Sequence, residues 1–502
     1  MPRSRLALVP IVLGALVVAG AIVPGTTATA DFRMTAAVRA AVARAEHPDL
    51  RAIPGVPTTR ASPEPLLAAR HPARAAAAGG AGAVTAATTA ALQQHMAHEL
   101  SLAGTQSGAY VYDMTTGKPL FAERATQRHP PASVEKLYTA VTALERMGPT
   151  AQLETTVLGA GHLAPGGVWQ GDLYLHGGGD PTFGSSAFIR SRYGGVGTSV
   201  STLAAQLKAQ GIGRVTGRVY GDESYFDSLR GEPSSGYAWD PYLEGDLSAV
   251  AFNRGETGRE QGQHAPAAYA ARQLRAALRG AGVVVEQGGG AATTPAGAVK
   301  LAVALSPTID QLLGLTLPPS DNFFAETLVK DLGARFGGPS PGAAPGGITA
   351  TPGTTTTPAA LAPAPVTGTT ARGAKVVRET IAELGLHPKV VDGSGLSEED
   401  QTSPYEVVTL LNEIAHTELG MILRGDLAVA GHTGTLAERM RGTAAAGRCE
   451  AKTGTLTGVS NLAGYCTAAD GDELAFAFFN DGISTEAAHV LQDNMAITLA
   501  DY

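Results

Sequence analysis

Three short motifs follow one another along the chain, and a long separation divides the first from the second. They are Ser133-Val134-Glu135-Lys136, Ser320-Asp321-Asn322 and Lys452-Thr453-Gly454. Each motif is common by itself, but in this order they describe a serine acyl-transfer site whose base is a lysine instead of a histidine. The chain must therefore fold so that these three distant segments meet around one serine.

The first motif supplies a nucleophile and its base. A serine hydroxyl needs an adjacent base in order to attack, and residues three apart on a helix share one face. Ser133 follows Pro130 and Pro131, which can precede or open a helix, and apolar residues continue at helical spacing to Leu144. We expect a helix that begins at Ser133 and places Lys136 beside it. The Ser133 N–H, at the positive end of that helix, is expected to help hold an oxyanion.

Lys136 has to be neutral for part of the cycle if it is the base, because a free lysine is protonated at neutral pH. Burial and a second nearby cation both lower the pKa of a lysine. Lys452 is our candidate for the second cation.

The third motif is expected to begin a strand. Residues 449–459 form a short, Thr-rich segment punctuated by glycine. Gly454 would let a substrate backbone approach closely. Lys452 and Thr453 are expected to bind a substrate carboxylate, and the Thr455 N–H is expected to be the second oxyanion donor.

Further stretches resemble the peptidase S13 family of D-alanyl-D-alanine carboxypeptidases, the class C low-molecular-mass penicillin-binding proteins. The resemblance begins near residue 85 and continues to the C-terminus. The long gap between the first two motifs distinguishes this family from smaller carboxypeptidases and class A β-lactamases. The stretches that carry the likeness are residues 129–140, 171–182, 321–328, 392–397 and 434–465.

The resemblance implies an acyl-enzyme mechanism on peptidoglycan. Ser133 would attack the carbonyl between the two terminal D-alanines of a stem peptide, with Lys136 as general base, and water would release the acyl group. Ser320 would relay a proton to the leaving amine, and Asn322 would hydrogen-bond the substrate. β-Lactams would inhibit by acylating the same serine, and the cross-link between stems would be a second substrate, an endopeptidase activity. Asp180 would contact the stem-peptide amine; the alternative is an ordinary turn residue.

Two other functions stay open at this point. One is a β-lactamase or esterase on the same scaffold, and the other is a non-catalytic wall-binding protein. The chain has no Glu-x-x-Leu-Asn motif, and its second motif begins with Ser320 instead of tyrosine, so fast lactam hydrolysis is not favoured. The net charge of -8 includes no basic run, which excludes electrostatic support for nucleic-acid binding. No metal or cofactor is expected.

The N-terminal residues are typical of an export signal. In residues 1–30, two arginines precede an apolar run, and Ala28-Thr29-Ala30 offers a cleavage site. The alternative is a retained anchor on the outer side of the cytoplasmic membrane, the only case in which we expect membrane contact. Residues 31–84 are expected to form a flexible linker to an enzyme that works in the cell wall or periplasm.

Export also permits disulfides. A hairpin that turns near Thr457-Gly458 would place Cys449 opposite Cys466, so we expect a bridge between them. Two buried free thiols are the alternative.

The expected fold is mixed α/β, an antiparallel sheet packed against helices as in penicillin-binding proteins and serine β-lactamases. Residues 85–147 and 306–502 form this domain, split by an inserted region, 148–305, of one or two smaller subdomains. Within the insertion we expect a strand at 214–220. Residues 337–373, dominated by Pro, Thr, Ala and Gly, are expected to be a disordered insertion before a helix at 374–384.

Overall fold

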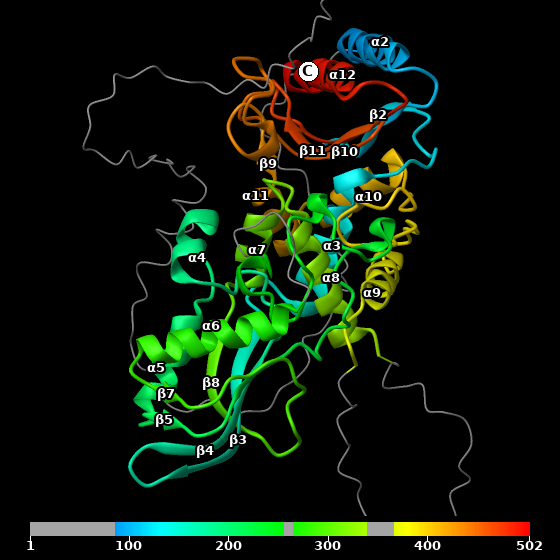
Figure 1. The fold of residues 1–502 in the computed structure, drawn as a ribbon. Coiled ribbons are helices and arrows are strands. Elements are labelled where there is room, and N and C mark those ends of the chain that lie inside the picture. Colours follow the sequence, from blue (N-terminus) through cyan, green and yellow to red (C-terminus); the bar gives the residue numbers. More distant parts are fainter. Residues whose placement is uncertain (1–85, 256–264, 339–365) are drawn as a thin grey trace, which may run out of the picture. The chain divides into compact units, whose positions relative to one another are not determined.

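The computed structural model describes residues 86–255, 265–338 and 366–502, whose helices and strands are drawn in Figure 1. The expected signal peptide and linker, residues 1–30 and 31–84, lie outside this part of the chain. Among the described residues, none of the helices has the length and apolar character that crossing a membrane requires.

The first sheet joins both ends of the described chain. Its six strands run in the order β2-β1-β12-β11-β10-β9, with antiparallel pairing throughout. Gly108 in β1 lies opposite Phe479 in β12, so the first strand takes one of its two neighbours from the last strand of the chain. The strands are β1 (Gly108–Asp113), β2 (Lys118–Glu123), β9 (Ala428–Val429), β10 (Cys449–Leu456), β11 (Val459–Thr467) and β12 (Glu473–Asp481).

Both faces of this sheet are buried, as β12 illustrates. Phe476 and Phe478 pack into a core with helices α2 (Ala86–Leu102) and α12 (Thr485–Asp501). The intervening Ala477 and Phe479 belong to the core on the opposite face, because side chains alternate along a strand. Figure 1 shows α2 and α12 together on one side of the sheet.

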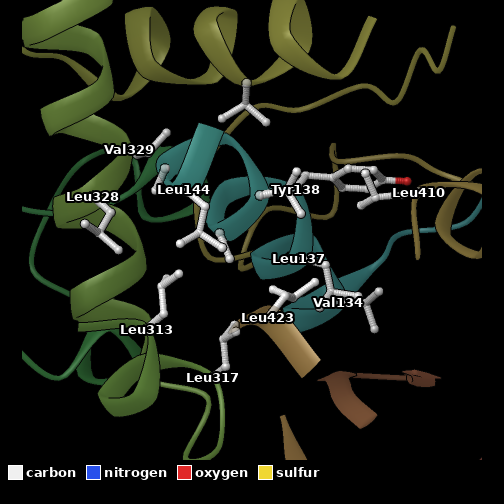
Figure 2. Close-up of a cluster of buried hydrophobic side chains, with 14 of the residues drawn as sticks. Val134, Leu137, Tyr138, Leu144, Leu313, Leu317, Leu328, Val329, Leu410 and Leu423 are labelled. Atoms are coloured by element: carbon white, nitrogen blue, oxygen red, sulfur yellow. The ribbon is translucent and has the colours of Figure 1, made fainter. Parts of the chain in front are cut away.

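Helix α3 (Lys136–Met147) lies in the middle of the opposite core. Figure 2 shows Leu137, Tyr138 and Leu144 among apolar side chains from the helices around it. Because α3 is surrounded by other helices, its sequence has apolar residues in every helical turn. The surrounding helices are α7 (Ile309–Thr316), α8 (Asn322–Phe336), α9 (Thr370–Ala382), α10 (Pro404–Ile414) and α11 (Glu418–Gly425).

The inserted region has its own sheet and its own core. The strand order is β7-β5-β4-β3-β8, with β6 also paired to β4. Helices α5 and α6 pack against this sheet in a single apolar cluster. The elements are β3 (Glu154–Ala164), β4 (Val168–His176), α4 (Ser186–Tyr193), α5 (Val200–Ala209), β5 (Arg214–Val215), β6 (Val219–Asp222), α6 (Pro266–Gly280), β7 (Val284–Val285) and β8 (Val299–Leu305).

The predicted mixed α/β fold with an inserted region is confirmed, and two details of the prediction are wrong. Residues 214–220 form two short strands, because Gly217 lies tightly against the backbone of Gly171 and interrupts the pairing. The disordered stretch predicted for 337–373 ends too late. Thr369 caps α9, which starts at Thr370 instead of 374, and residues 339–365 lie outside the described chain.

Candidate active site

Ser133 lies on a short 3-10 turn, η2 (Ala132–Glu135), that leads directly into α3. We predicted an α-helix from Ser133 itself; the tighter 3-10 turn is a common way for a helix to begin. The turn presents Ser133 half-buried, and the next turn of helix places Lys136 beneath it. Lys136 Nζ donates to Ser133 Oγ at 2.9 Å.

Strands β10 and β11 hold this nucleophile turn in place. Asn461 in β11 donates through Nδ2 to the carbonyls of Pro130 and Pro131, each at 2.9 Å. Gly454 in β10 packs so closely that a Cβ there would lie 2.6 Å from the Pro131 carbonyl oxygen. The glycine of the third motif therefore permits contact between its own strand and the nucleophile turn, in addition to the substrate approach that we predicted for it.

The Lys136 amine is fully buried and makes three hydrogen bonds. Besides Ser133 Oγ, it donates to Asn322 Oδ1 at 2.6 Å and to the Ser394 carbonyl at 2.7 Å. The first and second motifs therefore meet at one amine. Ser394 lies in the loop that follows α9, within the stretch 392–397 that also carries the family resemblance.

The pKa of Lys136 is lowered to about 8, with burial as the main cause. A buried ammonium loses its hydration, which favours the neutral amine. Nearby carboxyl groups oppose this effect and raise the pKa; they belong to Asp392, Glu326, Asp321 and Glu135. The balance leaves a lysine that can exist as a neutral base close to physiological pH.

Two buried acids hold the loop that carries the Ser394 carbonyl. Glu326 in α8 accepts from the backbone N–H groups of Gly393 and Ser394, each at 2.8 Å. Asp392 accepts from the N–H groups of Ser394 and Gly395. Burial and the charge of Asp392 raise the pKa of Glu326 to about 8, so Glu326 is mostly protonated at neutral pH.

Lys452 joins the second motif to the third. Its Nζ donates to Ser320 Oγ at 2.7 Å and to the Thr453 carbonyl at 2.9 Å. Burial lowers the pKa of Lys452 well below its usual value, and the charge on Lys136 lowers it further. The repulsion between the two lysines thus acts on Lys452, whereas burial is what lowers the pKa of Lys136.

Strand β10 leaves the Thr455 N–H on an open edge. Cys449 and Cys466 face each other with Cα atoms 4.1 Å apart, which is the spacing of a pair without backbone hydrogen bonds. The Cys449 carbonyl instead accepts from Ala430 N beside β9. Every second residue from Cys449 has the same orientation, and β9 pairs only with residues 450–451, so the Thr455 N–H points past the end of β9.

The middle residue of the second motif binds an arginine of the inserted region. Asp321 accepts from both terminal nitrogens of Arg254, at 2.6 and 3.1 Å. Asn322 Nδ2 donates to the carbonyl of Tyr242, also in the insertion, at 2.8 Å. Sequence reasoning missed Arg254 and Tyr242, because neither lies in a motif.

Comparison with known proteins agrees with this geometry. Residues 88–252, 243–350 and 361–502 match the D-Ala-D-Ala carboxypeptidase 3 (S13) family. The chain belongs to this family of serine-type carboxypeptidases. The chain is 31% identical over 487 residues to the D-alanyl-D-alanine carboxypeptidase of Actinomadura sp. strain R39. The aligned region covers 80% of this chain and 82% of that protein.

Two further comparisons concern a second relative and the fold. The carboxypeptidase is 29% identical over 389 residues to carboxypeptidase DacB of Mycolicibacterium smegmatis, covering 74% of this chain and 75% of that protein. The crystal structure of penicillin binding protein 4 (dacB) from Haemophilus influenzae superposes with a TM-score of 0.63 at 21% identity, covering 80% of this chain and 97% of the other. The two proteins therefore share their fold.

The carboxypeptidase contains the expected bridge between Cys449 and Cys466, which links β10 to β11 three residues before Lys452. Disulfides persist in oxidising compartments, so the bridge indicates an exported protein.

Asp180 is not brought to the serine and the two lysines. It is buried, and its carboxylate accepts from the backbone and hydroxyl of Thr182 at 2.8 and 2.6 Å. The adjacent Gly179 packs against Asp331 on α8. These contacts are those of a turn residue, the alternative role; contact with the stem-peptide amine stays a prediction.

Proposed function

We propose that Ser133 is the acylated nucleophile of an exported enzyme that trims peptidoglycan stem peptides, with Lys136 as its base. The observation that carries this proposal is the 2.9 Å contact between Lys136 Nζ and Ser133 Oγ, made by a buried lysine whose pKa is lowered to about 8. The cleaved bond joins the two terminal D-alanines.

In acylation, Ser133 Oγ attacks the carbonyl carbon of the penultimate D-alanine while its proton passes to neutral Lys136. Negative charge then develops on the carbonyl oxygen. We assign its stabilisation to the N–H groups of Ser133 and Thr455, because one opens a helix and the other faces an open strand edge.

The leaving D-alanine needs a proton on its amine. Ser320 Oγ accepts a hydrogen bond from Lys452, so the hydroxyl proton of Ser320 is free to be donated. We assign this transfer to Ser320. The proton that Lys136 took from Ser133 then replaces the one that Ser320 has given to the amine. The terminal carboxylate would be bound by Lys452 and by the hydroxyl of Thr453, which contacts the Thr435 hydroxyl at 2.8 Å. Water then attacks the acyl-enzyme and regenerates Ser133.

A β-lactam carbonyl would meet the same serine. Penicillin binding protein 4 of Haemophilus influenzae has been crystallised with a β-lactam, and it shares the fold of this chain. We propose that β-lactams acylate Ser133 and that the enzyme acts outside the cytoplasmic membrane, in the cell wall or periplasm.

The first experiment incubates the purified protein with penicillin and follows its intact mass, beside a Ser133→Ala variant. We expect a lasting adduct on the parent protein alone. Rapid consumption of penicillin without an adduct would indicate a β-lactamase. Absence of both would favour a wall-binding protein. Release of D-alanine from a pentapeptide then tests carboxypeptidase activity, and cleavage of a cross-linked peptide dimer tests endopeptidase activity.

A further inference from the structure

Arg254 is a charged side chain enclosed completely by the fold. Its exposed fraction is 0%. Taking a guanidinium out of water is unfavourable unless its donors are paired with good geometry. Arg254 meets this requirement through the two bonds to Asp321 and through a bond from Nε to the Glu244 carbonyl at 2.7 Å.

The partner of Arg254 has a special place in the sequence. Asp321 lies between Ser320 and Asn322, the two residues to which we assigned roles in proton transfer and substrate binding. Its Oδ1 also accepts from Phe324 N at 3.0 Å and so caps α8. One carboxylate therefore starts the helix that presents Asn322 and receives the arginine.

Ser320 has a backbone conformation that needs support. Its φ is +65°, in the left-handed region that residues other than glycine seldom adopt. Such a conformation persists only where the surroundings enforce it. The bonds on Asp321, the next residue, are part of that enforcement.

The loop that contains Arg254 wraps around the second motif. The guanidinium lies over the Phe323 ring, 4.7 Å from its centre. Gly245 allows the approach, since a Cβ there would lie 2.6 Å from that ring. The Tyr242 carbonyl binds Asn322. Residues of the segment 242–254 thus contact Asp321, Asn322 and Phe323, the residues that follow Ser320.

We propose that Arg254 is a positioning residue of the active site: by holding Asp321 it sets Ser320 and Asn322 in the arrangement that Lys452 and Lys136 require. The inserted region then contributes to the chemistry of the domain that it interrupts. This inference rests on the acyl-enzyme function proposed above.

Charge gives the proposal a readout beyond stability. Lys136 interacts with the carboxyl groups of Asp321, Glu135, Glu326 and Asp392, and its charge also acts on the buried amine of Lys452. Removing Arg254 leaves the charge of Asp321 uncompensated, which favours the protonated form of Lys136 and moves acylation to higher pH. Asp321→Asn removes a negative charge and has the opposite effect.

The experiment measures the second-order rate constant of penicillin acylation against pH for the full-length protein and its variants. Arg254→Met removes the charge and both bonds. Arg254→Lys keeps the charge but loses the two-pronged contact. Arg214→Met is the matched control, because Arg214 is an exposed arginine of the same inserted region that pairs with Glu286 at 3.0 Å, away from Arg254 and its partners. The fraction of protein that is finally acylated corrects each rate for misfolded molecules.

We expect Arg254→Lys and Arg254→Met to acylate about 10- to 100-fold more slowly per active molecule, since small displacements of catalytic groups have effects of this size. The pH profile should stay in place for Arg254→Lys, move upward for Arg254→Met and move downward for Asp321→Asn. Arg214→Met should match the parent.

The proposal is overturned if the acylation rate constant of folded Arg254→Lys lies within threefold of the parental value, a difference of about 0.7 kcal/mol. It is also overturned if the loss of acylation rate is fully explained by the fraction of misfolded protein and the pH profiles do not change. If Arg254→Met does not fold, Arg254→Lys and Asp321→Asn decide by the same criteria. Acylation of the parent, which depends on Ser133, separates failure of this inference from failure of the proposed function.

Discussion

Lys136 is held between two opposing influences. Its burial favours the neutral amine, while the carboxyl groups around it favour the ammonium. The Asn322 and Ser394 oxygens that would stabilise an ammonium also hold the nitrogen in place beside Ser133 Oγ. The residue is therefore poised to change its protonation state without moving, which is what a base in a repeated acyl-transfer cycle needs.

The first prediction concerns the pH dependence of this base. In the proposed mechanism Lys136 acts as a base in its neutral form, so the rate constant of penicillin acylation should rise with pH and level off above about 8. Stopped-flow measurement with a fluorescent penicillin would test this. Thermal unfolding at each pH serves as the control for intact protein. A flat profile between about pH 6 and 9 would rule out a titrating base with this pKa.

The second prediction concerns Glu326. Glu326→Gln keeps an oxygen that can accept from Gly393 and Ser394, and it resembles the protonated acid present below about pH 8. It should acylate at nearly the parental rate at neutral pH. Glu326→Ala removes the acceptor of the Gly393 and Ser394 N–H groups, so the loop that carries the Ser394 carbonyl is less well held, and acylation should be slower by about tenfold or more. Equal rates for both variants, measured with the same fluorescent penicillin, would contradict a positioning role for this acid.

At the scale of elements, β10 both carries Lys452 and supports the nucleophile turn. It can do so only because Gly454 brings strand and turn into contact and because Asn461 on the neighbouring strand ties the turn down. The position of Ser133 is thus set by two strands that lie more than 300 residues later in the chain than Ser133 itself.

The third prediction follows from this contact. Gly454→Ala places a methyl group 2.6 Å from the Pro131 carbonyl oxygen, so strand and turn must separate. We expect a loss of about 1–3 kcal/mol of unfolding free energy, as for other overpacked sites, and much slower acylation. Urea unfolding and acylation kinetics measure the two effects. Gly280→Ala is the control, since a Cβ there meets nothing within 4 Å. Parental behaviour of Gly454→Ala would show that the contact is dispensable.

Elements that rest on local patterns could be predicted from the sequence. The strands β10 and β11 and their turn at Thr457-Gly458 follow from Thr-rich composition and glycine placement. The partners that complete the site could not. Asp321 meets Arg254, and Glu326 meets Gly393, across 67 residues of chain in each case. Such pairs depend on how helices and loops pack in three dimensions, and no residue spacing in the sequence predicts them.

At the scale of the whole molecule, buried acids link folding to pH. The pKa of Asp426, which follows α11, is raised to about 8 by burial and by the charge of Asp310. The folded protein therefore keeps a proton that the unfolded chain releases near pH 4. Stability from this group is fully present below about pH 4 and declines as pH rises toward about 8.

The fourth prediction removes this dependence. Asp426→Asn cannot release a proton, so it should raise the unfolding free energy relative to the parent by at least about 1 kcal/mol at pH 8 but not at pH 4. Urea unfolding at the two pH values measures the difference. Acylation by penicillin at neutral pH is the control and should be unaffected. An equal shift at both pH values would mean that Asp426 does not titrate as described.

The first sheet is complete only when β12 pairs with β1. Gly108 can pair with Phe479 only after Phe479 has been synthesised. The nucleophile turn is made early, but the strands against which it rests, β10 and β11, are among the last segments to be translated. A nascent or truncated chain therefore has the serine and lacks the site. During synthesis, the geometry around Ser133 can therefore form only after β10 and β11 have been translated.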